Sequence, residues 1–214
     1  MRQRATQSMY AYWNGVRADR LAPRRIEIEP SRITDLLADT FILERIDTER
    51  FRFRLAGTRI CALLGPEFRI SDFLDPWGDE DRETLQRMFQ AMSTQGGVGL
   101  LEVEAATRDG GVSTTLEILV LPLLHTRDVV DRFLGSIVTN HHVELPPGSR
   151  LLLKRIVAHD IIWPDGRPHD VVDRMHRQAP FLPHIRSARI VRADRRQFRV
   201  YDGGLAKTDR DQQP

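Results

Sequence analysis

The sequence predicts an α+β domain in which a five-stranded antiparallel sheet carries helices on one face, with an N-terminal helix before it and a C-terminal extension after it. Three observations support this fold class. Residues 50–60, RFRFRLAGTRI, alternate arginine with bulky apolar residues, as a half-buried strand does. Residues 80–94 repeat apolar side chains at helical spacing. Three further strand-like runs then follow the helix breakers Gly96 and Gly97.

The composition is that of an ordinary globular chain. Of the 214 residues, 41% are hydrophobic and 29% are charged, which leaves enough apolar material for a core. No apolar run approaches the roughly 20 residues of a membrane helix, and the first residues lack the apolar stretch of a signal peptide. Cys61 is the only cysteine, which excludes an internal disulfide and a cysteine-rich metal site. We therefore expect a cytoplasmic protein that does not enter a membrane.

A helix is expected at the start of the chain, where Met9, Trp13 and Val16 share the i, i+4, i+7 spacing. Tyr10 and Trp13 add more aromatic bulk than one narrow apolar stripe requires. Two readings stay open: this helix meets a partner chain, or it caps the core of its own domain. We assign residues 1–29 to this helix and a linker.

The next segment predicts a short helix after Pro30 and then a β-hairpin. Strands are expected at residues 40–46 and from residue 51 onward, joined by a polar link at 47–49. Alternation places Phe51, Phe53 and Leu55 on a core face, with Arg52 and Arg54 on the opposite face. A short helix follows, with Thr58 as its expected N-cap and Gly65 as its end.

The second half of the domain predicts one long helix and three strands. Asp79 is the expected cap of the helix at 80–94, and the strands are expected at residues 98–107, 112–124 and 132–143. The turn at 108–111, RDGG, is a strong hairpin signal. The LPPGS stretch at 145–149 marks a boundary, so we assign the domain to residues 30–145 and the extension to 146–214. In the extension, residues 150–164 fit a strand or a helix, residues 188–204 resemble a hairpin, and the end predicts disorder.

Several stretches resemble the small alphaproteobacterial proteins built on a single PAS domain. The resemblance covers about residues 8–143 and rests on YAYW, APRRIEIEPSRITDLLADTFILE, RFRFRLAGTRICALLG, EDRETLQRMF, LVLPL and LGSIV. It implies a sensory and regulatory module without shared catalytic residues. A ligand would lie between the sheet and the helices. A homodimer would form through the N-terminal helix, at Tyr10 and Trp13, or through the outer sheet face, and an unidentified protein would be the partner.

Two polar residues within apolar strands, Glu117 and Ser136, are the first candidates for a ligand site. A carboxylate in a central strand needs a partner, which Arg54 or Arg59 would supply; the alternative is an ion pair on the solvent face of the sheet. The expected ligand-binding set combines these polar residues with apolar ones, each of which also fits a plain core: Phe53, Leu55, Phe68, Phe73, Phe89, Glu117, Ile118 and Ser136.

The sequence predicts neither a haem nor a flavin cofactor, and it identifies no other cofactor. The helix at 80–94 holds no histidine to ligate haem iron. Cys61 lies outside the motif of flavin photosensors and is expected to be a small buried side chain. Adjacent His141 and His142 would point to opposite faces of a strand, so no metal site is expected.

The sequence therefore favours a regulatory protein that acts by binding a ligand or a protein and is not an enzyme. Two alternatives stay open. One is a small isomerase or dehydratase in which His125, His141 or His142 works with Glu117. The other is nucleic-acid binding through the arginine-rich segment at 186–199, which the overall arginine bias and the scarcity of aromatic residues argue against.

Overall fold

The computed structural model describes residues 1–125, 128–167 and 169, which belong to one compact unit, Met1–Val171. The helices and strands follow one another along the chain as α1 (Arg4–Arg17), η1 (Arg25–Glu27), η2 (Pro30–Arg32), η3 (Thr34–Asp39), β1 (Thr40–Arg45), β2 (Phe51–Ala56), α2 (Thr58–Leu64), η4 (Pro66–Ile70), α3 (Asp79–Gln95), β3 (Val98–Thr107), β4 (Ser113–Leu124), β5 (Val130–Thr139) and β6 (Leu151–Ile162). The η elements are single turns or short runs of 3₁₀ helix.

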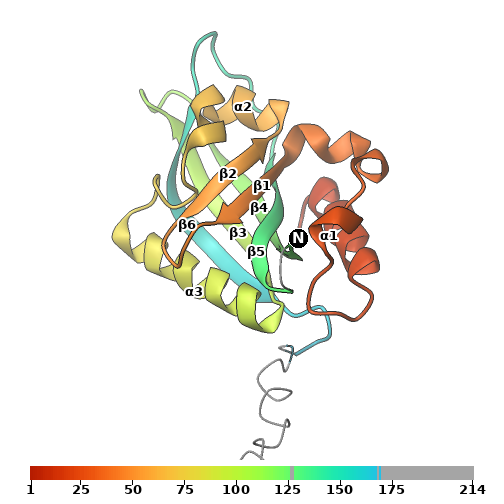
Figure 1. Cartoon of the computed structure of the whole chain (residues 1–214). Helices are drawn as coiled ribbons and strands as arrows, with labels where there is room; N and C mark the ends of the chain where they lie inside the picture. The colour runs from red at the N-terminus through yellow and green to blue at the C-terminus, as the bar shows by residue number, and fades with distance from the viewer. Residues whose placement is uncertain (126–127, 168, 170–214) are drawn as a thin grey trace, which may run out of the picture. The chain divides into compact units, whose positions relative to one another are not determined.

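The sheet is antiparallel throughout, in the order β2-β1-β5-β4-β3-β6 (Figure 1). The five strands predicted before Pro146 are all present, and β6 adds a sixth. β6 pairs with β3 over its whole length, from Val98 opposite Ile162 to Thr107 opposite Leu151. Residues 151–162 are therefore a strand, which decides between the two structures that their sequence allows.

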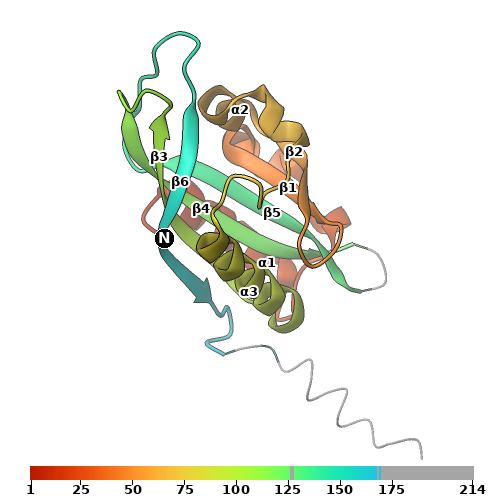
Figure 2. The same ribbon diagram turned by 90° about the vertical axis from the view of Figure 1, so that its left-hand side faces the viewer.

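Helical elements lie on both faces of the sheet (Figures 1 and 2). The inner face carries α3, whose Met88 and Met92 lie against Gly99 of β3. The outer face carries α1, where the indole Nε1 of Trp13 donates a hydrogen bond to the carbonyl oxygen of Pro122, at 2.8 Å. The central strand β4 is consequently buried on both faces, as its long apolar run requires.

A β-bulge in β2 corrects the predicted facing of one residue. Ile42 pairs with Leu55, whereas the next residue of β1, Leu43, pairs with Phe53. Arg54 is therefore an extra residue in β2, and it reverses the alternation beyond Phe53. Phe51 and Phe53 face the core as predicted, but Leu55 lies on the outer face with 44% of its surface exposed.

Other differences concern the ends of the helices. The helix expected after Pro30 is a series of 3₁₀ turns, η2 and η3. The caps of α2 and α3 are Gly57 and Gly78, and neither cap makes a side-chain hydrogen bond. The expected caps, Thr58 and Asp79, are instead the first helical residues. The hairpin and disorder predicted toward the C-terminus fall outside the described residues.

Candidate functional site

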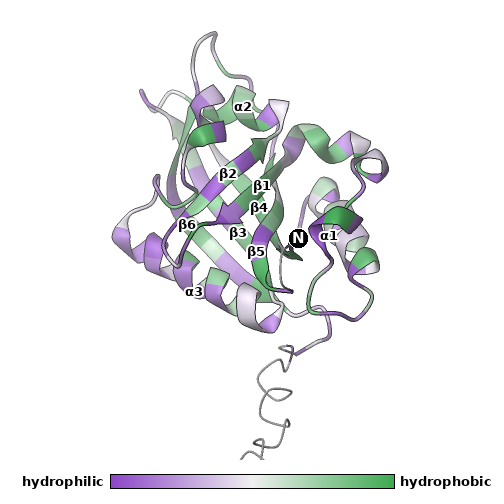
Figure 3. Ribbon diagram, in the orientation of Figure 1, coloured by the Kyte–Doolittle hydropathy of each residue, from purple (hydrophilic) through white to green (hydrophobic). Residues whose placement is uncertain are grey.

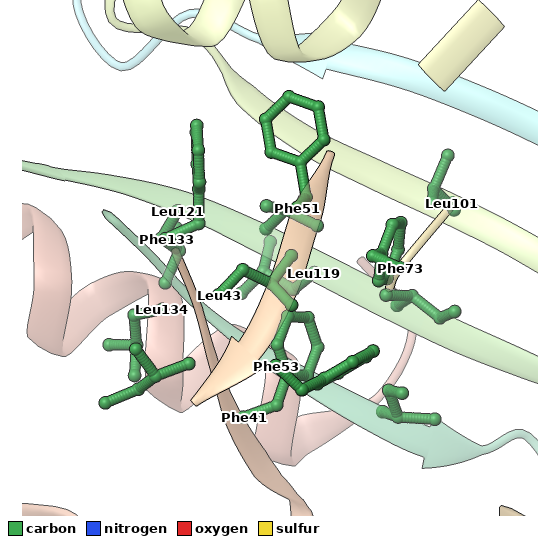
Figure 4. Close-up of a cluster of buried hydrophobic side chains, with 14 of the residues drawn as sticks. Phe41, Leu43, Phe51, Phe53, Phe73, Leu101, Leu119, Leu121, Phe133 and Leu134 are labelled. Carbon is green, nitrogen blue, oxygen red and sulfur yellow. The ribbon is translucent and has the colours of Figure 1, made fainter. Parts of the chain in front are cut away.

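The inner face holds a cluster of phenylalanine rings in mutual contact (Figure 4). Phe51 stacks on Phe89 of α3 with ring centroids 3.8 Å apart, and Phe133 meets both rings edge to face. Phe73 joins the cluster through an edge-to-face contact with Phe89 at 5.7 Å. These rings fill the space between α3 and the sheet, which is where the sequence placed a ligand.

Most of the predicted ligand-binding residues belong to this packed interior. Phe53 contacts Phe68 and Phe73, with centroids 4.6 and 5.9 Å apart, and Phe73 contacts Phe89. Ile118 is fully buried in β4. The other three predicted residues, Leu55, Glu117 and Ser136, lie on the outer face, so the structure does not bring the eight residues together at one site.

The partner predicted for Glu117 is wrong. Its carboxylate is buried at the outer face and accepts hydrogen bonds from the backbone N–H groups of Arg2 and Gln3, at 2.7 and 3.1 Å. The two arginines proposed as partners are engaged elsewhere: Arg54 pairs with Glu44, and Arg59 pairs with Asp39. The carboxylate therefore anchors the start of the chain to the sheet.

An open groove lies on the outer face beside β1 and β2. It has a volume of about 550 Å³. We call it the outer groove, and its lining residues are Arg25, Ile28, Pro30, Ile33, Leu37, Ala38, Thr40, Ile42, Arg54, Leu55, Ala56, Gly57, Thr58, Arg69 and Leu134. Of these residues, only Leu55 belongs to the ligand-binding set predicted from the sequence.

The wall of the outer groove opposite the sheet is the segment from η1 to η3, and close backbone packing holds it in place. A Cβ on Gly57 would collide with the carbonyl oxygen of Ala38, so only glycine allows β2 to end against η3. The hydroxyl of Thr40 donates to the carbonyl oxygen of Leu36, at 2.7 Å. In Figure 3 the hydrophobic stretch of η3 lies next to β1.

An ion pair ties the same wall to α2. Asp39, at the end of η3, is buried and pairs with the guanidinium of Arg59. Burial raises the pKa of this carboxyl above its ordinary value, and the nearby Arg59 opposes that effect. The pair joins the end of η3 to α2.

The charged residues that line the outer groove are all arginines. Arg54 pairs with Glu44, but Glu44 also binds Arg132 at 2.6 Å, so one carboxylate serves two cations. The Nε of Arg69 donates to the thiol sulfur of Cys61, at 3.1 Å. Cys61 is half-buried rather than buried as predicted.

The N-terminal helix packs on its own domain, which favours the second of the two readings left open for it. Trp13 and Met9 are completely buried against the sheet. Trp13 is therefore a core residue of this chain, whereas Tyr10 stays partly exposed beside it.

The described histidines do not assemble a site with Glu117. His141 and His142 are exposed after the end of β5, and the imidazole Nδ1 of His125 lies 3.7 Å from Asp131. Within the described residues, no three His, Cys, Asp or Glu side chains are grouped so as to hold a metal ion. The arginine-rich segment at 186–199 lies outside them.

No helix among the described residues combines the length and the apolar character needed to cross a membrane.

The sequence did not predict the outer groove because the residues that line it belong to segments that look like linker and strand in the sequence. The available signal was the pair of isoleucines at 28 and 33, which a short polar linker does not need and which both line the groove.

Comparison with known proteins identifies the family. No curated protein and no solved structure matches the chain significantly. The family model of the PAS domain matches residues 1–138, which contain α1, the outer groove and the five strands β1 to nearly the end of β5. The chain therefore belongs to the PAS domain family, whose members are sensory and regulatory modules.

Proposed function

We propose that this chain is a cytoplasmic PAS regulator, of the alphaproteobacterial single-domain kind, that acts by binding a ligand or a protein partner and not by catalysis. The outer groove is its binding site. Of the residues predicted from the sequence, Leu55 belongs to this site. The aromatic residues of the inner face serve as the structural core.

One observation carries this proposal: the interior is filled by stacked phenylalanines while an apolar groove stays open on the outer face. Sites for small molecules are concave, mostly apolar and carry a few polar groups, and the outer groove has each of these properties. Self-association through Tyr10 or the outer face is compatible with this proposal, whereas Trp13 is too deeply buried to contribute.

The experiment is a charge introduced into the groove, compared with a matched charge elsewhere. Leu55 of β2 is 44% exposed, and Val157 of β6 is 46% exposed outside the groove. Both positions are exposed strand residues, so Leu55→Asp and Val157→Asp should change the free energy of unfolding little, by about 1 kcal/mol or less.

A gene that encodes each variant replaces the native gene in the cell. The abundances of all cellular proteins in each strain are then compared with those in the wild-type and deletion strains. We expect Leu55→Asp to reproduce the profile of the deletion strain and Val157→Asp to match the wild type, with equal amounts of both variants in the cells. A Leu55→Asp strain with the wild-type profile would rule out the outer groove as the functional site.

A further inference from the structure

We infer that the outer groove binds a free single-chain amphiphile with a carboxylate head group. The inference rests on the proposed function of the outer groove and specifies its ligand. It follows from the shape of the groove, the apolar character of its floor and the chemistry of its charged residues.

The floor of the groove suits an alkyl chain. Ile42 of β1 and Leu134 of β5 face it from the sheet, and Ile28 and Ile33 face it from the opposite wall. The volume of about 550 Å³ lies within the range of about 300–1,000 Å³ typical of small-molecule sites. A concave apolar surface contacts a single alkyl chain on several sides. It cannot make such contacts with the flat surface of a membrane.

The charged lining suits a carboxylate. Arg25, Arg54 and Arg69 come from three different elements, η1, β2 and η4, and the lining includes no aspartate, glutamate or lysine. Neither Arg25 nor Arg69 forms an ion pair with a described residue. Guanidinium groups bind carboxylates through paired, charge-assisted hydrogen bonds, so arginines that line an apolar groove favour an anionic head group.

The same features argue against a cationic or neutral amphiphile. A cationic head group would approach the guanidinium groups of Arg25 and Arg69, which no described acid offsets, and that of Arg54, whose acid partner Glu44 is shared with Arg132. A neutral head group would displace water from these arginines without supplying a negative charge to compensate theirs. The carboxylate is thus the head group that the groove complements best.

Calorimetric titration of the full chain with fatty acids below their micelle concentration tests the inference. We expect octanoate, nonanoate and decanoate to bind with affinities that rise about fourfold per added methylene, as burial of each methylene predicts. An alcohol of equal chain length should bind about tenfold more weakly, because it lacks the charge-assisted hydrogen bonds.

Four variants locate the site and the head group. Arg25→Gln combined with Arg69→Gln should weaken decanoate binding about tenfold and leave binding of decanol unchanged. Arg87→Gln, on the exposed surface of α3, is the control and should bind like the wild type. Leu55→Asp should abolish binding of both compounds, whereas Val157→Asp should preserve it.

Several results would overturn the inference and leave the proposed function standing. Equal affinity for decanoate and decanol would exclude recognition of the carboxylate. No binding of any fatty acid would exclude the ligand class, while loss of regulation in the Leu55→Asp strain would still identify the groove as the functional site. Co-sedimentation with phosphatidylglycerol vesicles that Leu55→Asp abolishes would mean that the groove takes a membrane lipid instead. An unaffected Leu55→Asp strain would remove the proposed function itself.

Discussion

Glu117 shows how one buried carboxylate fixes the start of the chain. Its oxygens accept the N–H groups of Arg2 and Gln3, immediately before α1 begins. A negative charge at this position also complements the positive end of the helix dipole. Hydrogen bonds to a charged group are stronger than those between neutral groups, and a buried donor that loses its partner is costly.

Replacement of this carboxylate should destabilise the fold measurably. We expect Glu117→Gln to lower the free energy of unfolding by about 1–3 kcal/mol, because the amide offers one oxygen in place of two and carries no charge. Urea denaturation at neutral pH measures the change. Glu104→Gln, which breaks only the exposed pair with Arg155, is the control and should cost less than about 1 kcal/mol. Equal losses in the two variants would refute the role of Glu117 as an anchor.

The side chains of single residues could be predicted only as far as regular alternation holds. Phe51 and Phe53 face the core as their period of two requires. Leu55 does not, because the extra residue Arg54 has no signature in the sequence and its effect depends on pairing with β1. The partner of Glu117 was equally inaccessible, since Arg2 and Gln3 are distant in sequence and act through their backbone.

At the scale of elements, α1 is held to the sheet at both of its ends. Glu117 holds its start, and near its end the guanidinium of Arg17 pairs with Asp165 in the turn after β6. Arg17 also lies over the ring of Trp13, with its Cζ 5.8 Å from the ring centroid. The pair between Arg17 and Asp165 joins the first helix to the turn after the last strand, although the two are far apart in the sequence.

The pair between Arg17 and Asp165 should make this attachment sensitive to acid. The hydrogen bond from Arg17 lowers the pKa of Asp165 below its ordinary value. A carboxyl with a lowered pKa stabilises the folded state above the unfolded-state pKa of about 3.9, and this contribution is lost as the pH falls through the folded-state pKa.

Asp165→Asn should therefore lower the free energy of unfolding at pH 7 and make little difference at about pH 2–3. The side chain of Asp165 is 37% exposed, so solvent screening limits the difference at pH 7 to about 1 kcal/mol or less. Urea denaturation of both proteins across this pH range provides the test. Stability curves that stay a constant distance apart at every pH would contradict the expected loss of the ion pair.

Elements whose apolar residues repeat with a clear helical or strand period were predictable, and elements without such a repeat were not. The pattern in residues 80–94 corresponds to α3, and the three runs after Gly96 correspond to β3, β4 and β5. The segment before β1 forms 3₁₀ turns that line the outer groove, which local spacing does not show. β6 was ambiguous because a short apolar run fits both periods, and only its pairing with β3 decides.

At the scale of the whole described unit, the positions of α1 and α3 determine which parts of the sheet are covered. α3 covers the inner face, and α1 covers the outer face over β4 and β5 (Figure 2). The part of the outer face formed by β1 and β2 lies beyond α1, and the outer groove opens there. The two helices thus leave the β1 and β2 part of the outer face uncovered, whereas the family resemblance predicted a ligand inside the domain.

The filled interior itself can be tested by opening it. Phe89 is buried and contacts Phe51, Phe73 and Phe133, so Phe89→Ala should cost about 3–5 kcal/mol and leave a cavity lined by aromatic rings. A dry apolar cavity of this kind binds benzene. We therefore expect benzene to raise the melting temperature of Phe89→Ala and to leave that of the wild type unchanged, as measured by calorimetry. A rise of similar size in the wild type would mean that the interior already has room for a ligand, and the argument for the outer groove would lose its basis.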